Sequence, residues 1–402
     1  MALVPVSEAL ARLLDGVEPL PAESVALSEA FERVLAGPLA ALRTQPPFDA
    51  SAMDGYALRA DDVATVPARL AVVGTAAAGH PFQGHVGSGE AVRIFTGAPL
   101  PAGADAIVIQ ENVRDLGEGL IQVLEGSAPG RHIRFTGLDF SEGEILLKKG
   151  RILDAAALSL AASANHPRLD VVRRPLVAII ATGDELLPPG SDLGPGKIIA
   201  SNAFGVVAAA RSVGADVLDL GIASDNREAI AALIRKAVAA RADVLVTLGG
   251  ASVGDHDLVN DVLTSEGMKL DFWRIAMRPG KPLMFGRLQG VRCIGLPGNP
   301  VASIVCSQLF LKPLLAGLGG RPFQQVMREA TLGIAMPAND RREDYVRAVV
   351  LKEDAGRTVA TPFGVQDSSM LKTLADADGL IVRAPFAPAA QVGDTCTVLM
   401  LR

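Results

Sequence analysis

Apolar residues near the start of the chain recur at the three-and-four spacing of a helix. The repeat is made of Leu10, Leu13, Leu14 and Val17. It predicts an amphipathic helix for which Ser7 is a plausible N-cap. A second amphipathic stretch covers residues 27–35.

Between residues 46 and 135 the pattern changes to short apolar runs that are broken by glycine and proline. Residues 70–73 and 106–109 are two such runs. This pattern of short apolar runs predicts a small β-rich domain. The alanine-rich stretch 154–164 that follows predicts a helix with Asp154 as its cap.

From Arg174 onward, strand-like and helix-like segments alternate. The strand-like runs are 175–180, 215–220 and 244–248, and the helix-like runs are 202–213, 227–240, 258–265 and 300–318. Such alternation predicts a mostly parallel sheet with helices on both faces. After Pro322 the alternation is lost, and the strand-like runs 346–351, 358–361, 380–382 and 395–401 predict a small terminal barrel or sandwich.

Composition narrows the class of protein. A chain of 402 residues is too long for one ordinary core, so we expect two to four domains. The formal net charge of −6 argues against non-specific nucleic-acid binding. No uninterrupted apolar run approaches the ~20 residues of a membrane span. Cys293, Cys306 and Cys396 lie far apart, which excludes a disulfide framework and a thiolate zinc site. We therefore expect a soluble cytoplasmic protein with no membrane or nucleic-acid partner.

The segment 244–257 holds the first candidate site. A buried strand leads directly into Gly249-Gly-Ala-Ser-Val-Gly-Asp-His-Asp257. Glycines allow a close approach to a ligand, free amides can cradle an anion, and α/β sheets bind ligands beyond the carboxyl ends of their strands. The loop therefore predicts the floor of a phosphate site. The alternative is a glycine-rich turn that ends in a helix cap, and this segment alone does not decide between the two.

Three acidic residues follow separate strands: Glu185, Asp225 and Asp257. In a parallel sheet these positions converge on one edge, where carboxylates with water or phosphate oxygens can make an octahedral magnesium site. Such a site polarises a phosphate and positions water. Asp225 by itself is better explained as a structural helix cap.

A short basic segment carries Arg274, Arg278 and Lys281, separated by proline and glycine. Arginine offers planar contacts to oxyanions and lysine offers a compact charge. The segment predicts a rigid wall of an anion pocket, with a solvated charged strand as the alternative. No Ser-His-Asp or Gly-x-Ser-x-Gly pattern supports nucleophilic catalysis.

Six motifs together resemble the molybdopterin molybdenumtransferase family, the molybdenum insertases that are also found as the E domain of gephyrin. The motifs are Met53-Asp-Gly-Tyr-Ala57, Phe95-Thr-Gly-Ala-Pro-Leu-Pro101, Thr182-Gly-Asp-Glu-Leu186, Gly249-Gly-Ala-Ser-Val-Gly254, Lys281-Pro282 and Leu296-Pro-Gly-Asn-Pro300. They occur in the family's order through the whole chain. No single motif is specific, but the combination is.

The resemblance implies the final step of molybdenum cofactor synthesis. Adenylylated molybdopterin and molybdate are the implied substrates, molybdenum is placed on the dithiolene, and hydrolysis of the pyrophosphate bond releases AMP. Magnesium is the implied cation. The implied assembly is a homodimer with its active cleft between the α/β domain of one subunit and the second domain of the other. Molybdopterin adenylyltransferase and molybdoenzyme maturation factors are further possible partners.

The resemblance also implies a multidomain α/β fold with four domains. A discontinuous, elongated domain for dimerisation takes residues 1–45 and 136–172, and a β-rich domain takes 46–135. A central three-layer α/β domain of the molybdopterin-binding type takes 173–321, and a β-barrel-like domain takes 322–402.

Functional residues follow by position within the matching motifs. The implied catalytic residues are Asp54, Thr96, Asp139, Glu185, Asp225 and Asp257, of which Glu185, Asp225 and Asp257 serve the metal. The implied substrate-binding residues are Gly249, Gly250, Ser252, Gly254, Arg274, Arg278, Lys281, Pro282, Pro297, Asn299, Arg347 and Ser368. Arg274 and Arg278 depart from the family, whose members often carry lysine there, which puts the affinity for molybdate in question. Ser369 competes with Ser368 for its role.

Two other functions remain open at this point. A molybdopterin adenylyltransferase shares the α/β domain and the glycine-rich loop, but it is one small domain. A non-catalytic scaffold of the gephyrin kind is the second, and retention of all three acidic candidates speaks against it.

Overall fold

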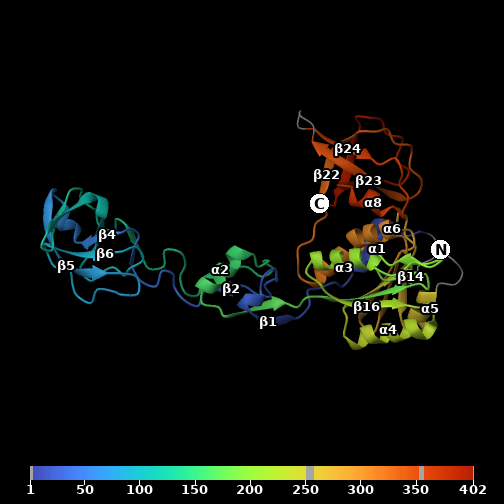
Figure 1. Ribbon diagram of the computed structural model, residues 1–402, viewed down its shortest axis with the longest axis horizontal. Helices are drawn as coiled ribbons and strands as arrows, with labels where there is room; N and C mark the ends of the chain where they lie inside the picture. Colours follow the sequence, from blue (N-terminus) through green and yellow to red (C-terminus); the bar gives the residue numbers. More distant parts are fainter. Residues whose placement is uncertain (1–2, 250–257, 353–356, 402) are drawn as a thin grey trace. The chain divides into compact units, whose positions relative to one another are not determined.

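The structure, a computed structural model, describes residues 3–249, 258–352 and 357–401 and divides into two compact units (Figure 1). The first unit takes residues 1–23, 32–34 and 171–402, and the second takes 24–31 and 35–170. Each unit is therefore assembled from pieces that are far apart in the sequence. β1 (Ala22–Ala26) pairs with β12 (Arg168–Val172), where the chain enters and leaves the second unit.

The first unit contains a six-stranded sheet in the order β16-β13-β17-β21-β20-β18. The strands are β13 (Leu176–Thr182), β16 (Asp216–Ala223), β17 (Val244–Leu248), β18 (Lys269–Trp273), β20 (Met284–Leu288) and β21 (Val291–Leu296). The pairs β16–β13, β13–β17 and β17–β21 are parallel, whereas β20 is antiparallel to both of its neighbours. The prediction of a mostly parallel sheet is confirmed, with an antiparallel edge.

Helices cover both faces of this sheet. They are α1 (Val6–Leu14), α3 (Asn202–Ser212), α4 (Arg227–Ala239), α5 (Leu258–Ser265), α6 (Pro300–Cys306) and α7 (Lys312–Leu318). Along β17, Val244 and Val246 pack in the cluster with α1, α3, α6 and α7, whereas Leu245 packs in the cluster with α4 and α5. This alternation follows from the period of two in a strand, and burial on both faces explains why β17 is apolar throughout.

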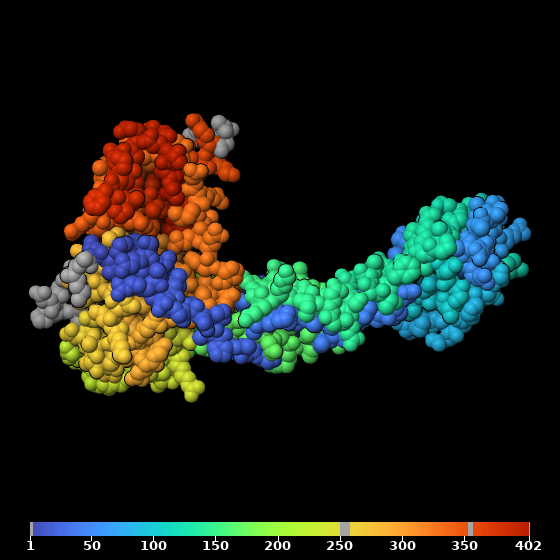
Figure 2. Space-filling view, turned by 180° about the vertical axis from the view of Figure 1, so that it is seen from behind, coloured from blue at the N-terminus to red at the C-terminus, as the bar shows by residue number. Residues whose placement is uncertain are grey.

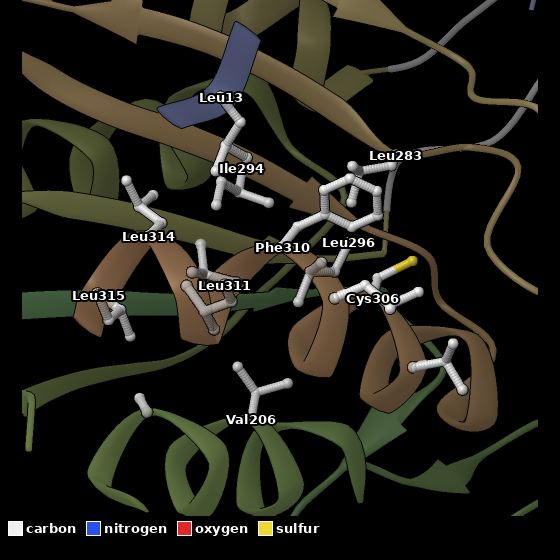
Figure 3. Packing of buried hydrophobic residues seen from close by; sticks show 14 of the residues in the cluster. Leu13, Val206, Leu283, Ile294, Leu296, Cys306, Phe310, Leu311, Leu314 and Leu315 are labelled. Carbon is white, nitrogen blue, oxygen red and sulfur yellow. The ribbon is translucent and has the colours of Figure 1, made fainter. Parts of the chain in front are cut away.

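The run from Pro300 to Leu318 is a core element. α6 passes through a short π-helical turn, η4 (Ser307–Leu311), into α7. Figure 3 shows Phe310, Leu311 and Leu314 between the sheet residue Ile294 and Val206 of α3. By length and composition this run could cross a membrane, but most of it is buried inside the protein, as expected for the central helix of a domain.

The C-terminal region forms a closed barrel. Its strands are β22 (Met327–Leu332), β23 (Glu343–Lys352), β24 (Thr358–Pro362), β25 (Gly379–Arg383) and β26 (Thr395–Met400), and a short helix, α8 (Leu371–Ala375), lies between β24 and β25. They pair in the order β23-β24-β22-β26-β25, and the pair β23–β25 closes the barrel. A short strand of the preceding region, β19 (Met277–Arg278), pairs parallel with β23. The barrel is thereby tied to the basic segment of the α/β region.

The start of the chain also belongs to this unit. Figure 2 shows the N-terminal segment, in dark blue, against the α/β region in yellow and orange. The Val4 amide donates to the Arg274 carbonyl at 3.2 Å, and the Ala276 amide donates to the Val4 carbonyl at 2.7 Å. The predicted helix begins at Val6, with Pro5 rather than Ser7 at its N-cap position.

The second unit contains another six-stranded sheet, in the order β7-β4-β6-β5-β9-β8. The strands are β4 (Gly55–Leu58), β5 (Ala68–Ala76), β6 (Glu90–Ile94), β7 (Ala106–Ile109), β8 (Val113–Gly117) and β9 (Leu120–Val123), with short 3-10 turns at η2 (Ala60–Val63) and η3 (Gln110–Asn112). A Cβ at Gly55 would lie 2.1 Å from the Val108 carbonyl oxygen, so the close pairing of β4 with β7 requires glycine. The predicted β-rich region is confirmed.

The rest of this unit is built from small pieces. β2 (Leu39–Ala40) pairs with β11 (Ile145–Leu147), and β3 (Ala50–Ser51) pairs with β10 (Ile133–Arg134). The helix α2 (Ala155–Ser163) has Asp154 at its N-cap, where the carboxylate accepts from the Ala157 amide, as predicted.

The second amphipathic stretch, 27–35, is not a helix. Only a single 3-10 turn forms there, η1 (Leu27–Glu29). The Leu27 amide donates to the Pro167 carbonyl and the Leu35 amide to the Arg151 carbonyl, while Glu32 takes a positive φ of 58°. Backbone donors that are committed to distant segments cannot form helical bonds, so tertiary pairing overrides the local pattern.

Candidate functional site

Loops from several strands of the α/β sheet converge on one cleft of about 1010 Å³. They follow β13, β16, β17 and β21, and the basic segment and the barrel supply the remaining walls. Nine of the predicted residues line it: Glu185, Asp225, Gly249, Arg278, Lys281, Pro282, Pro297, Asn299 and Ser368. The carboxyl ends of parallel strands meet at one edge, and for this reason Glu185, Asp225, Gly249 and Asn299 share a cavity although they follow four different strands.

Glu185 is held by short-range backbone pairing. β14 (Leu186–Leu187) pairs with β15 (Ile198–Ile199), and the Ile198 amide donates to the Glu185 carbonyl at 2.8 Å. Gly183 has a φ of +149°, and a Cβ there would lie 2.5 Å from Glu185 Oε2. The Glu185 carboxylate therefore lies directly over Gly183, in space that only a glycine leaves open.

Asp225 is fixed by an acidic neighbour from the other loop. The Asp225 amide donates to Asp184 Oδ1 at 3.1 Å, and the Asp184 amide donates to Asp225 Oδ2 at 3.3 Å. The cap of α4 is instead Asn226, whose Oδ1 accepts from the amides of Glu228 and Ala229. Asp225 is therefore not a helix cap. Its position beside the cleft is set by the two hydrogen bonds with Asp184.

The predicted metal ligands are described only in part. Asp257 lies outside the described residues, as do Gly250, Ser252 and Gly254. Among the residues that the structure does describe, no group of three or more His, Cys, Asp or Glu could hold a metal ion. The sheet loops present the carboxylates of Glu185 and Asp225 to the cleft, and the barrel adds that of Asp367 beside Ser368. Magnesium usually keeps several waters and takes one or two carboxylates together with substrate phosphates, so this donor set fits it.

The basic segment contributes two cations with different surroundings. Arg278 donates from Nε to Asp344 Oδ1 at 2.9 Å and from a terminal nitrogen to Asp344 Oδ2. These hydrogen bonds raise the pKa of Arg278. Lys281 lines the same cleft. Gly280 lies between Arg278 and Lys281 in the sequence. A Cβ there would lie 2.6 Å from the buried Cys306 Sγ, so the backbone of the segment packs closely against α6.

Arg347 lies in an adjoining cavity of about 570 Å³, which shares Arg278, Pro279 and Gln366 with the cleft. Its side chain is only 2% exposed. The guanidinium donates to Gln366 Oε1 at 3.1 Å and to the Met370 carbonyl at 3.2 Å, both of which are uncharged acceptors. Burial lowers the pKa of Arg347. The nearby carboxylate of Asp367 acts against this lowering, so Arg347 is a buried cation whose hydrogen-bond acceptors are neutral and whose charge is offset only from a distance.

The choice between Ser368 and Ser369 is a geometric one. Asn299 Nδ2 donates to Ser368 Oγ at 2.8 Å, and both residues line the cleft. Ser369 Oγ instead donates to Asp367 Oδ1 at 2.5 Å and lines a smaller neighbouring cavity. Ser368 is the better candidate for contact with a substrate.

Arg274 is placed differently from the other basic residues. Its guanidinium lies 5.4 Å from the centre of the Trp273 ring, and the residue is not among those that line the cleft. Its φ is +93°. The Arg274 carbonyl accepts from the Val4 amide of the N-terminal segment. Its side chain lies against Trp273 and outside the cleft.

Asp54, Thr96 and Asp139 belong to the second unit. The Thr96 amide and Thr96 Oγ1 both donate to Asp54 Oδ1, each at 2.8 Å. These two bonds, the backbone bond first, lower the pKa of Asp54. Asp139 is exposed, and its amide donates to the Gln45 carbonyl at 3.0 Å. Thr96 thus holds the Asp54 carboxylate through Oδ1, and Asp54 Oδ2 takes part in neither of these hydrogen bonds.

Several polar residues at the site were not among the predicted ones, including Asp184, Arg342, Asp344 and Asp367. The sequence shows Asp184 next to Glu185, but it does not show that Asp184 and Asp225 exchange hydrogen bonds. Arg342 lines the cleft from the barrel, and Asp344 is a buried partner of Arg278. No local motif marks either residue, because each gains its position from the pairing of β19 with β23.

Three family models match successive parts of the chain. They are the "MoeA N-terminal region (domain I and II)" over residues 4–165, the "Probable molybdopterin binding domain" over 178–317 and the "MoeA C-terminal region (domain IV)" over 329–401. Together they cover most of the sequence.

Similar proteins cover nearly the full chain. The molybdopterin molybdenumtransferase of Bacillus subtilis is 35% identical over 407 residues, which span 99% of this chain and 94% of that protein. The enzyme of the same name from Haemophilus influenzae is 33% identical over 98% of both chains. The crystal structure of the molybdopterin biosynthesis MoeA protein from Pyrococcus horikoshii superposes with a TM-score of 0.85 at 31% identity, over 100% of both chains.

Proposed function

The chain belongs to the MoeA family of molybdopterin molybdenumtransferases, and on that premise we propose that its cleft performs the last step of molybdenum cofactor synthesis. In this reaction molybdenum passes from molybdate to adenylylated molybdopterin, and hydrolysis of the pyrophosphate bond releases AMP. Both molybdate and the adenylylated pterin are substrates.

One observation carries the proposal. A single cleft brings carboxylates and cations together from segments that are far apart in the chain, with Glu185 and Asp225 on the sheet loops and Lys281 on the basic segment. A substrate with a pyrophosphate bridge needs acidic groups for a divalent cation and basic groups for its oxygens. The cleft offers both within one cavity.

Glu185 and Asp225 would hold the magnesium ion, together with substrate oxygens and water. The ion would supply charge stabilisation at the phosphate and would orient a water molecule. The protein's own contribution is to hold the carboxylates before substrate binds. Gly183 leaves the space for Glu185, and Asp184 fixes the backbone of Asp225. Asp257 would add a third carboxylate in the role that the family resemblance implies.

Molybdate would bind beside Lys281, toward the adjoining cavity that holds Arg347. Lys281 contributes a compact charge, and Arg347 contributes a buried one that is already desolvated. Pro282, Pro297 and Asn299 line the cleft beside Lys281, and Ser368 offers a hydroxyl there. Because Arg278 is already paired with Asp344, we assign it a smaller share of oxyanion binding than Lys281.

We further propose a cytoplasmic homodimer. Phe31, Phe135 and Leu138 of the second unit are 56%, 51% and 66% exposed, and apolar side chains this exposed favour burial against a second copy. All three cysteines are free, which suits a reducing compartment. Asp54, Thr96 and Asp139 would act in a cleft that two subunits complete.

The test is a defined reaction with purified protein, adenylylated molybdopterin, magnesium and molybdate, in which AMP is measured by chromatography. The proposal predicts AMP release that requires both molybdate and magnesium. AMP release without dependence on molybdate would contradict it.

The two alternatives give different results in the same assay. Formation of adenylylated molybdopterin from ATP and molybdopterin by this chain alone would identify an adenylyltransferase. A scaffold would bind the adenylylated pterin without turnover under any of these conditions.

A further inference from the structure

Arg342 reaches the cleft from the barrel, on a turn that is rigid. Asn339 Nδ2 donates to the Arg342 carbonyl at 2.8 Å, to the Ala384 carbonyl at 2.9 Å and to the Arg383 carbonyl at 3.1 Å. The Asp340 amide donates back to Asn339 Oδ1 at 2.9 Å. One asparagine side chain thus locks the turn 339–342 onto the barrel, so Arg342 is presented from a fixed backbone.

Among the carboxylates of the described residues, the one that pairs with the guanidinium of Arg342 is Asp340. The guanidinium donates from Nε to Oδ1 at 3.3 Å and from a terminal nitrogen to Oδ2 at 2.8 Å, and the Arg342 amide also donates to Oδ1. The Arg342 side chain is 26% exposed and that of Asp340 is 46% exposed. An ion pair this exposed is weak, and a guanidinium has five N–H donors, of which Asp340 takes two.

Asp340 also faces the second arginine of the cleft. Its Oδ2 lies 3.8 Å from a terminal nitrogen of Arg278. Arg278 has a stronger partner in the buried Asp344, so Asp340 is paired chiefly with Arg342, in an ion pair that is open to solvent. The pKa of Asp340 is lowered to about 2, chiefly by its hydrogen bond from Arg342, so it stays ionised at neutral pH.

We propose that Arg342 is a further substrate-binding residue, which contacts a tetrahedral oxyanion in the cleft, and that Asp340 occupies its guanidinium until that oxyanion binds. The planar fork of arginine suits both a carboxylate and a tetrahedral oxyanion, so one can replace the other without moving the turn. The inference rests on the proposed function in that the cleft is the substrate site. Two oxyanions of that reaction share the required chemistry: a phosphate group of the adenylylated pterin and molybdate.

The test measures binding of inorganic pyrophosphate and, separately, of molybdate to the full-length protein by calorimetry at low ionic strength, without divalent cations. The variants are Arg342→Gln, Arg342→Lys, Asp340→Asn and Arg341→Gln. Arg341 is the matched control, because it is exposed, adjacent in sequence and lines a different cavity. Thermal unfolding of each variant verifies that the barrel is intact.

We expect Arg342→Gln to weaken binding of at least one oxyanion roughly 10-fold, as for a lost charge-assisted contact, and Arg342→Lys to weaken it less. Asp340→Asn should tighten the same oxyanion about 2- to 5-fold, because the competing charge is gone, and added salt should reduce the gain. The oxyanion that responds identifies the source. A merely structural role for the pair would weaken binding in both variants, so opposite signs distinguish the two roles.

Binding in Arg342→Gln that equals that in Arg341→Gln for both oxyanions would overturn the proposal, as would no binding of either oxyanion to the unaltered protein. If the oxyanion data follow the expected pattern but molybdate-dependent AMP release is absent, the proposed function fails and the assignment of Arg342 stands.

Discussion

Arg278 of the α/β region and Asp344 of the barrel form an ion pair at the edge of the cleft. Arg278 lies on β19, beside the α/β sheet, and donates to both carboxylate oxygens of Asp344 on β23 of the barrel. Asp344 is only 6% exposed. The parallel pairing of Met277 with Glu343 and of Arg278 with Asp344 sets this register. The basic segment is therefore held by the barrel on one side, in addition to its contacts with the N-terminal segment and with α6.

Replacing Asp344 by Asn should destabilise the protein by about 1–2 kcal/mol, since two bonds from the half-exposed Arg278 to a buried carboxylate become one bond to a neutral amide oxygen. Equilibrium unfolding in urea measures the change. Arg227→Gln, which removes an exposed pair with Asp261, serves as the control and should cost less than about 1 kcal/mol. An equal effect of the two variants would mean that the Arg278–Asp344 pair adds no stability.

Glu185→Gln and Asp225→Asn should each lower molybdate-dependent AMP release by about 100-fold or more, because each removes a charge needed for the magnesium ion. Both side chains lie in the cleft, so the unfolding midpoint should change little. Asp192→Asn, at an exposed position after the same loop, should retain full activity. Normal turnover in either test variant would remove that carboxylate from the mechanism.

Gly249→Ala should be far more damaging than Gly190→Ala. Both glycines have φ near +90°, so alanine at either position carries the same backbone strain. At Gly249 the added Cβ would also lie 2.9 Å from the Thr182 carbonyl oxygen, whereas at Gly190 nothing lies within 4 Å. We expect losses of about 1 kcal/mol at Gly190 and of about 3 kcal/mol, with weakened activity, at Gly249. Chemical unfolding of both variants compares them directly.

Ser368→Ala should raise the KM for molybdate several-fold, whereas Ser369→Ala should leave it close to that of the unaltered enzyme. Only Ser368 Oγ lies in the cleft, where it accepts from Asn299. Loss of one neutral hydrogen bond corresponds to about 1 kcal/mol, or roughly fivefold. Steady-state kinetics at varied molybdate concentration measures the difference, and the reverse order of the two variants would assign the role to Ser369.

Thr96→Val should raise the pKa of Asp54 part of the way toward its ordinary value of 3.8. The variant loses the Thr96 hydroxyl bond and keeps the backbone bond, which is the larger cause of the lowered pKa. NMR titration of the Asp54 carboxyl measures the change. Thr136→Val removes a hydroxyl bond to Asp49 in a matching arrangement, and it should leave the titration of Asp54 unchanged.

The same pair predicts a pH dependence of stability. Because the pKa of Asp54 is lowered in the folded state, its contribution is present above 3.8 and is lost as pH falls through the folded value. The difference in melting temperature between the unaltered protein and Thr96→Val should therefore be largest near neutral pH and vanish in strong acid. A difference that grows with acidity would contradict this account.

If the proposed dimer forms through the second unit, Leu138→Asp should convert it to a monomer, because Leu138 is 66% exposed and a charge there cannot be buried against a second copy. Light scattering after size exclusion measures the mass. Val392→Asp, at a residue of the first unit that is 65% exposed, is the control and should not change it.

The local sequence pattern predicted secondary structure correctly where that structure depends on a single segment. The buried run 244–248 became β17, and Asp154 became the cap of α2. The prediction of a helix at 27–35 was wrong because amides of this stretch bond to distant carbonyls. The prediction of Ser7 as an N-cap was wrong because α1 already starts after Pro5. In each failure a partner that is remote in sequence, or a backbone restriction, outweighed the local preference.

The sequence by itself determined which loops carry chemistry, because a strand that ends in Gly183-Asp184-Glu185 or in Gly249 leaves a functional group at the edge of a parallel sheet wherever that sheet lies. Only the tertiary structure decided which cations face those carboxylates. Arg342 joins the cleft, Arg347 lies in an adjoining cavity and Arg274 turns to Trp273, although all three are equally basic in the sequence. The reason is that a charged side chain takes its position from the strand pairing and burial around it, and neither is encoded in its immediate neighbours.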